Sequence, residues 1–179
     1  GSNRKGTIHP DKGVCIDVCF DGKIKGIMAN YRCDEFWCNP AFLENMSDIP
    51  DETQLLIVEQ ENGRFIVVVP VLNDRYKNVI VGKSENTFTV REFSWYDGLY
   101  DMSGLSFVYA FGENPHMLVE CCVKEALKIL NNGTRHISER RYPEVLEYLG
   151  WCTWDSMQIK VCEEGILEKC EEFKEKNVP

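Results

Sequence analysis

The alternation of apolar and polar residues along residues 14–111 predicts a series of short β-strands. Asp21-Gly22 and Asn62-Gly63 each separate two such runs, and these dipeptides favour tight hairpin turns because they tolerate positive φ angles. Pro70 lies near the end of an apolar run, where an edge position or a bulge tolerates it. Short strands joined by turns are typical of an antiparallel β-sandwich. The expected strands are residues 14–20, 23–31, 52–59, 65–71, 78–82, 87–93 and 105–111.

The apolar period changes after Asn114-Pro115, which places a helix N-cap before a proline at the first helical position. Asn132-Gly133 marks the expected end of this helix. The apolar residues between these two signals recur at helical spacing and include Leu118, Cys122, Ala126 and Ile129. A helix is therefore expected to follow the sandwich and to bridge it to the rest of the chain.

The C-terminal part of the chain predicts a strand followed by a helix. Residues 137–143 are charged and are expected to form a linker, and a short helical turn is expected at residues 143–147. Residues 149–154 predict a strand, and residues 163–176 predict a helix with Ile166, Cys170 and Phe173 on one face. A strand followed by a helix is the first step of a parallel architecture. We therefore expect a sandwich domain (1–112), a helix and linker (113–147) and a strand-helix unit (148–179).

Composition limits the classes of partner. The chain has 179 residues, 20 Lys and Arg against 29 Asp and Glu, and a net charge of −9. Without a visible basic patch, this balance argues against nucleic acid and anionic membranes as partners. The nine cysteines form no CxxC pair, and we expect reduced, buried thiols in a cytoplasmic protein. Cys33 and Cys38 have no nearby His, so we expect no zinc site and no cofactor.

Residues 149–156 (LGWCTWDS) hold the strongest candidate chemistry in the chain. On a strand, Trp151 and Trp154 would face opposite sides, and Asp155 would lie at the turn that follows. An indole face can stack on the C–H face of a sugar ring, and a carboxylate can accept hydrogen bonds from its hydroxyls. The alternative is that the two Trp and the Cys between them belong to the core, because Trp is heavily buried on average.

The motif Gly150-Trp151-Cys152-Thr153-Trp154-Asp155 resembles the signature of the raffinose synthase, alkaline α-galactosidase and seed imbibition protein group of glycoside hydrolase family 36. The resemblance extends over residues 27–179, with one departure: Glu163 stands where the family has Pro before the segment Glu164-Gly165-Ile166. Further matching segments follow the family's order along the chain: Phe36-Trp37, residues 49–56 (IPDETQLL) and residues 111–115 (FGENP).

The resemblance implies a large β-sandwich of the super-sandwich type, then a (β/α)8 barrel, then a small C-terminal β domain. Such enzymes hydrolyse or transfer α-galactosyl groups with retention, and they use one Asp as nucleophile and another as acid and base. The implied ligand is an α-galactoside or a galactinol-type sugar. Both catalytic Asp are expected beyond residue 179, since a complete barrel needs about 250 residues. The chain would thus be an N-terminal part, and we expect no glycosidase activity from it alone.

The same resemblance suggests roles for individual residues. Trp154 is expected to stack on galactose at the end of the first barrel strand. Asp155 is expected to bind sugar hydroxyls or to cap the following turn, and it does not match the nucleophile. Trp37 is a candidate for reaching the sugar from the sandwich. Trp151 and Cys152 are expected to pack.

Two alternatives to the enzyme hypothesis remain open. The sandwich could be a stand-alone carbohydrate-binding or interaction module, with a site near Trp37 or in the polar-aromatic loop around Trp95. The chain could also have a structural role only. In that case the apolar face of residues 163–176 would stay exposed and would favour self-association.

Overall fold

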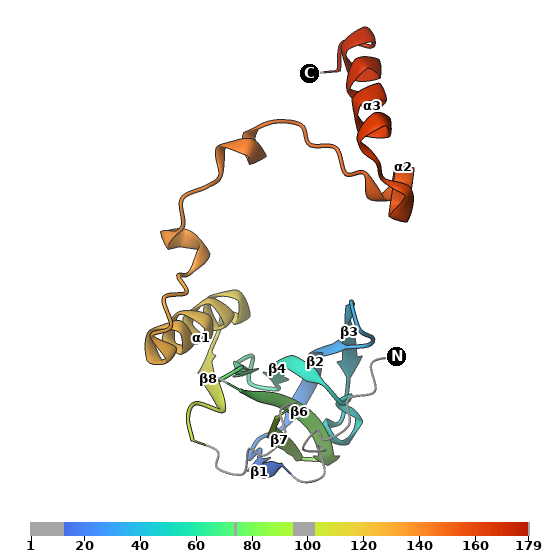
Figure 1. The fold of residues 1–179 in the computed structure, drawn as a ribbon. Coiled ribbons are helices and arrows are strands. Elements are labelled where there is room, and N and C mark those ends of the chain that lie inside the picture. The colour runs from blue at the N-terminus through green and yellow to red at the C-terminus, as the bar shows by residue number, and fades with distance from the viewer. Residues whose placement is uncertain (1–12, 74, 95–102, 179) are drawn as a thin grey trace. The chain divides into compact units, whose positions relative to one another are not determined.

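The computed structural model describes residues 13–73, 75–94 and 103–178, so the loop around Trp95 lies outside the described residues. The chain divides into two compact units, Gly1–His136 and Ile137–Pro179, which are described separately. The predicted boundaries at 112/113 and 147/148 stay predictions. The first unit holds eight strands and one long helix (Figure 1): β1 (Val14–Cys19), β2 (Ile24–Arg32), β3 (Cys38–Leu43), β4 (Thr53–Gln60), β5 (Phe65–Pro70), β6 (Tyr76–Ser84), β7 (Thr87–Ser94), β8 (Phe107–Gly112) and α1 (Pro115–Leu130).

All eight strands belong to one antiparallel sheet with the order β1-β7-β6-β4-β2-β3, and β5 pairs with both β4 and β8. The sheet branches at β4. β2 pairs with one side of β4 from Thr53 onward. On the other side, Thr53 pairs with Ile80 of β6, whereas residues 56–59 pair with β5. The predicted antiparallel, β-rich class is confirmed, and the super-sandwich subtype stays a prediction. All seven strands expected between residues 14 and 111 form, and Asn62-Gly63 joins β4 and β5 as a hairpin. The hairpin predicted at Asp21-Gly22 is wrong, because β1 pairs with β7 and not with β2. β3 was not expected, because Pro40 and a lack of alternation hide it in the sequence.

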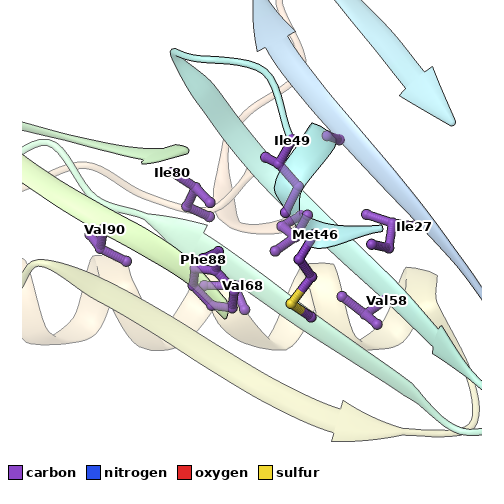
Figure 2. Packing of buried hydrophobic residues seen from close by; sticks show 10 residues of the cluster. Ile27, Met46, Ile49, Val58, Val68, Ile80, Phe88 and Val90 are labelled. Carbon is purple, nitrogen blue, oxygen red and sulfur yellow. The ribbon is translucent and has the colours of Figure 1, made fainter. Parts of the chain in front are cut away.

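The main hydrophobic core lies between the β2, β4 and β5 side of the sheet and the β6 and β7 side. A short 3-10 turn, Met46–Asp48, places Met46 in this core with no exposed surface. Figure 2 shows the Met46 side chain among Val58, Val68 and Phe88. The segment between β3 and β4 therefore connects the two strands and also contributes a core side chain.

A second core lies on the opposite face of β5, where α1 packs against β5 and β8 (Figure 1). Val67 faces this core and Val68 faces the main core, which explains why β5 is an almost continuous apolar run. Asn114 caps α1 as predicted, because its side chain accepts hydrogen bonds from two backbone N–H groups. Cys122 is buried here, but Ile129 is exposed, so the expected apolar face is wrong at that position.

Pro70 is the last residue of β5. The backbone N–H of the next residue, Val71, donates to Ser106 on the β8 side at 2.9 Å, so the Pro70 nitrogen faces the β4 side. The pairing of β5 with β4 has already ended at Val68. Pro70 thus occupies a local edge, where a missing N–H costs nothing, although β5 itself is paired on both sides.

The second unit contains two α-helices, α2 (Trp154–Met157) and α3 (Glu163–Glu175), and the 3-10 turns Ile137–Glu139, Glu144–Glu147 and Gln158–Lys160. The helical turn expected at 143–147 and the helix expected at 163–176 are confirmed. No residue among 137–178 is buried. Among the described residues of the whole chain, no helix is long and apolar enough to cross a membrane.

The strand expected at residues 149–154 is not formed. Residues 151 and 152 have no regular structure, and α2 begins at Trp154. A strand needs a neighbour to pair its backbone N–H and C=O groups, and nothing else among residues 137–178 is a strand. The local sequence pattern at residues 149–154 was therefore not enough to form a strand. The assignment of this unit to the opening of a barrel stays a prediction.

All nine cysteines are free, as expected. The expectation that they are buried is wrong for eight of them, since only Cys122 is buried. Cys15 and Cys19 show the reason. They alternate with Val14, Ile16 and Val18 on the edge strand β1 and take the face away from the main core.

Candidate functional site

Trp154 and Asp155 begin the short helix α2. The turn is closed by the Met157 N–H, which donates to the Thr153 carbonyl oxygen at 2.8 Å. Trp154 is 61% exposed and Asp155 is also exposed, so an indole face and a carboxylate stand next to each other in solvent. Such a pair has the two groups that stack on and hydrogen-bond to a sugar. Asp155 also lies in the first turn of α2, where a carboxylate is favoured by the helix dipole, so its capping role stays open.

Trp151, the other indole of the motif, packs within the unit. Its ring meets Phe173 of α3 edge-on, with centroids 5.4 Å apart and an interplanar angle of 87°. This contact agrees with the packing role that the sequence suggested. Cys152 is exposed, so the packing role suggested for it is wrong. Phe173 is half-buried by this arrangement, whereas Ile166 and Cys170 on the same helix are exposed.

Trp37 lies at the tip of the β2–β3 hairpin in the first unit. Asp34 shapes the tip, because its Oδ1 accepts hydrogen bonds from the backbone N–H groups of Phe36 at 2.7 Å and Trp37 at 2.9 Å. The Trp37 carbonyl oxygen accepts a hydrogen bond from the Cys33 N–H at 3.0 Å. Trp37 is 68% exposed, so it does not belong to the hydrophobic core of the first unit.

The segment at residues 49–54, which also carries the resemblance, has a structural role. Thr53 is fully buried, and its Oγ1 donates to a backbone carbonyl three residues earlier at 2.7 Å. Glu52 has a positive φ of 61°, and its Oε2 lies 2.5 Å from Lys77 Nζ and 3.5 Å from Arg32 Nη1. This ion-pair cluster fixes the start of β4 against β2 and β6. The sequence contained one signal for this ion-pair cluster, because two acidic residues stand directly before an apolar strand. The basic partners, Arg32 and Lys77, are distant in the sequence, so the pattern could not identify them.

Two of the three candidate site residues are consecutive in the sequence, and the structure brings the third to neither of them. Trp154 and Asp155 are neighbours in the second unit, and Trp37 belongs to the first unit. Across the described residues, no group of His, Cys, Asp and Glu side chains could hold a metal ion. Hydrogen bonds from Lys83, Lys124 and Lys169 lower the pKa values of Asp17, Glu120 and Glu172, respectively. These carboxylates form surface ion pairs, and none of them belongs to the candidate site.

Comparison with known proteins connects the motif to a family. The family described as raffinose synthase or seed imbibition protein Sip1 matches residues 17–179. The chain is 26% identical over 166 residues to a probable galactinol–sucrose galactosyltransferase 1 of Arabidopsis thaliana, covering 86% of this chain and 22% of that protein. It is 24% identical to stachyose synthase of Pisum sativum (86% and 18% covered). It is 29% identical to the galactinol–sucrose galactosyltransferase of Pisum sativum (82% and 19% covered). The chain spans about a fifth of the length of these relatives.

Proposed function

Because the chain belongs to the raffinose synthase and seed imbibition protein family, we propose that it is the N-terminal part of a larger carbohydrate-active enzyme that hydrolyses or transfers α-galactosyl groups. The match along residues 17–179 is the observation that carries this proposal. The names of the relatives supply the substrate class, since they describe transfer from galactinol to sucrose and the synthesis of stachyose. The proposed ligand of the complete protein is therefore an α-galactoside or a galactinol-type sugar.

Trp154, Asp155 and Trp37 are the proposed sugar-binding residues. The exposure of Trp154 beside a carboxylate supports the first two, because an exposed indole is free to stack on a galactose ring. The exposure of Trp37 at a hairpin tip ordered by Asp34 supports the third. The proposal assigns no catalytic residue to this chain. Retaining transfer needs two carboxyl groups about 5 Å apart, and we place both in the remainder of the enzyme.

The proposal is tested with galactinol and sucrose as substrates and chromatography of the products. We expect neither raffinose nor free galactose from the 179-residue chain. We expect raffinose or free galactose from a longer product of the same gene, whose transcript should continue with the barrel. Product formed by the 179-residue chain would contradict the assignment of the catalytic pair. A longer product that acts on neither substrate would contradict the galactosyl function.

The role of Trp154 is tested in that longer product. Trp154→Ala should raise the KM for galactinol about tenfold, which corresponds to the loss of one stacking contact. Ile159→Ala removes another exposed apolar side chain of the same unit and serves as the control. An equal KM in the two variants would show that Trp154 does not bind the sugar.

A second candidate function is a non-catalytic carbohydrate-binding module formed by the first unit. The exposed Phe36-Trp37 tip is the observation that favours it. Calorimetry with galactose and raffinose separates the two functions. Binding by the 179-residue chain that Trp37→Ala abolishes and Phe36→Ala preserves would support the module. Absence of binding would support a site that needs the rest of the enzyme.

We also propose a cytoplasmic location and a tendency of this chain to self-associate. Eight exposed free thiols are compatible with a reducing compartment. Exposed Ile166 and Leu167 on α3 support self-association, because uncovered apolar surface favours contact with a partner. Fractionation of cells that express the protein tests the location. Light scattering across a concentration series tests self-association. A secreted protein or a strictly monomeric one would contradict them.

A further inference from the structure

The main core of the first unit reaches the surface along one seam. Within the described residues, β1 pairs only with β7, and β8 pairs only with β5, so these two strands end the sheet on the two sides of the seam. Val18 of β1 pairs with Phe88, and Tyr109 of β8 pairs with Val68. Phe88 and Val68 are buried core residues, and directly paired residues face the same side of a sheet. Val18 and Tyr109 therefore face the core side, although Tyr109 is 66% exposed.

A cavity of about 410 Å³ lies along this seam. Its lining is mostly apolar and contains four aromatic rings, those of Phe20, Phe88, Phe107 and Tyr109. The volume falls in the range of about 300–1,000 Å³ that is usual for small-molecule sites. A void of this size lined by core side chains exposes apolar surface to water, so an apolar occupant is favoured.

One end of the cavity is polar. Asp21 and Gln60 line it there, and the same two residues line an adjoining hollow of about 310 Å³ that also contains Lys23, Glu61 and Asn62. Lys23 and Glu61 form an exposed ion pair with Nζ 3.5 Å from Oε2. The hollow therefore contains positively charged, negatively charged and neutral hydrogen-bonding side chains, and it adjoins the apolar cavity. Such a rim suits a neutral group with several hydroxyls better than an anion or a cation.

We propose that the seam between β1 and β8 binds a neutral amphiphile of the alkyl or aryl glycoside class. The apolar chain or ring occupies the aromatic cavity, and the sugar head hydrogen-bonds to Asp21 and Gln60 in the hollow. A purely apolar ligand fits less well, because it fills the cavity but makes none of these hydrogen bonds. The proposal uses only residues of the first unit and does not depend on Trp37, Trp154 or Asp155.

The experiment uses the 179-residue chain and the fluorescent probe N-phenyl-1-naphthylamine, a neutral aromatic amine that brightens in apolar sites. Hexyl glucoside, 1-hexanol and glucose compete with the probe. Hexyl glucoside should displace the probe at about a tenfold lower concentration than hexanol, which corresponds to one or two net hydrogen bonds, and glucose alone should displace none. Displacement by hexanol as effective as displacement by hexyl glucoside would overturn the proposed head-group site.

Two matched variants locate the site. Tyr109→Ser removes a ring that lines the cavity, and we expect about tenfold weaker binding of the probe from the lost apolar contact. Phe111→Ser is the control, because Phe111 lies two residues along the same strand and is similarly exposed at 63%, but does not line the cavity. Equal affinities of these two variants for the probe would show that the binding site does not lie in this cavity.

Asp21→Asn keeps the size of an exposed side chain, and it tests the polar end without touching the core. Circular dichroism checks that each variant is folded. If Tyr109→Ser fails to fold, Asp21→Asn alone decides: it should remove most of the advantage of hexyl glucoside over hexanol. An unchanged advantage would overturn the proposal. Loss of probe binding in Phe42→Ser, which alters a different surface hollow beside β3, would also overturn it.

Discussion

At the residue scale, burial separates one cysteine from the other eight. Cys122 lies under α1 against β5 and β8, and this burial raises the pKa of its thiol to about 11, with a smaller contribution from Cys121. The thiolate is the reactive form, so the Cys122 thiol should react slowly even where water could reach it. The helical spacing of Leu118, Cys122 and Ala126 predicted that Cys122 lies on the apolar face of the helix, and the structure confirms this.

We therefore predict that eight of the nine thiols react rapidly with a thiol reagent at pH 8, and that Cys122 reacts only after unfolding. The reagent releases a chromophore when it reacts with a thiol, so the absorbance gives the number of reacted thiols. The measurement is made with and without denaturant. The Cys122→Ala variant is the control and should show the same eight fast thiols. Nine fast thiols in the folded protein would show that α1 opens readily.

Glu172 in α3 is the most strongly shifted carboxylate among the described residues. Hydrogen bonds from Lys169 and Lys176 lower its pKa to about 2. Because the pKa is lowered, these contacts exist in full above the ordinary carboxyl pKa and disappear as the pH falls through about 2. Lys169→Met should raise the pKa of Glu172 toward its ordinary value, and NMR titration measures it. Lys160→Met should leave it unchanged; an equal shift in both variants would rule out the specific contact.

At the scale of the elements, β6 is positioned by contact with the Met46–Asp48 turn. Gly82 is required at this point. Its N–H donates to the Ile49 carbonyl oxygen at 3.0 Å, and a Cβ atom on Gly82 would lie 2.4 Å from the Met46 carbonyl oxygen and 2.5 Å from that of Ser47. These contacts are shorter than atoms allow, so the turn that carries Met46 into the core would have to move.

Gly82→Ala should therefore lower the free energy of unfolding by about 1–3 kcal/mol, the usual range for an overpacked site. Gly26→Ala is a matched control in the neighbouring part of the sheet, because no atom lies within 4 Å of the point where its added methyl group would stand. It should change the free energy by less than about 0.5 kcal/mol. Urea denaturation measures both. A Gly82→Ala protein as stable as the control would show that the turn is not fixed to β6.

At the scale of the whole molecule, the buried residues are confined to one of the two units. Every buried hydrophobic residue of the described chain lies between Ile27 and Ala126, and residues 137–178 bury none. A unit of this length without a core is not expected to fold cooperatively alone. The first unit contains both hydrophobic cores and the complete described sheet.

A chain of residues 1–136 should therefore fold alone and retain the free energy of unfolding of the 179-residue chain within about 1 kcal/mol. Urea denaturation followed by circular dichroism measures this. Residues 137–179 as a separate peptide should show no cooperative transition. A large loss of stability in the shortened chain would mean that the second unit supports the first.

The sequence by itself determined seven of the eight described strands, the helices α1 and α3, and the candidate chemistry. Period-2 and period-3.6 patterns, the hairpin dipeptide Asn62-Gly63 and the cap at Asn114 act within a few residues, so they located seven strands, α1 and α3. The motif at residues 150–155 indicated the family for the same reason, since it is a local string of residues. The exposure of Trp37, Trp154 and most cysteines was not encoded in such local patterns.

Only the tertiary structure decided how these elements pair and what they leave open. The branching of the sheet at Thr53, the burial of Met46 from a loop and the ion pairs of Glu52 join residues distant in sequence. The failed strand at residues 149–154 shows the same dependence, because a strand forms only where a partner accepts its hydrogen bonds. The cavity between β1 and β8 exists for this reason too. No local pattern marks the residues that line it, and they come together because β1 and β8 are two of the edge strands of the described sheet.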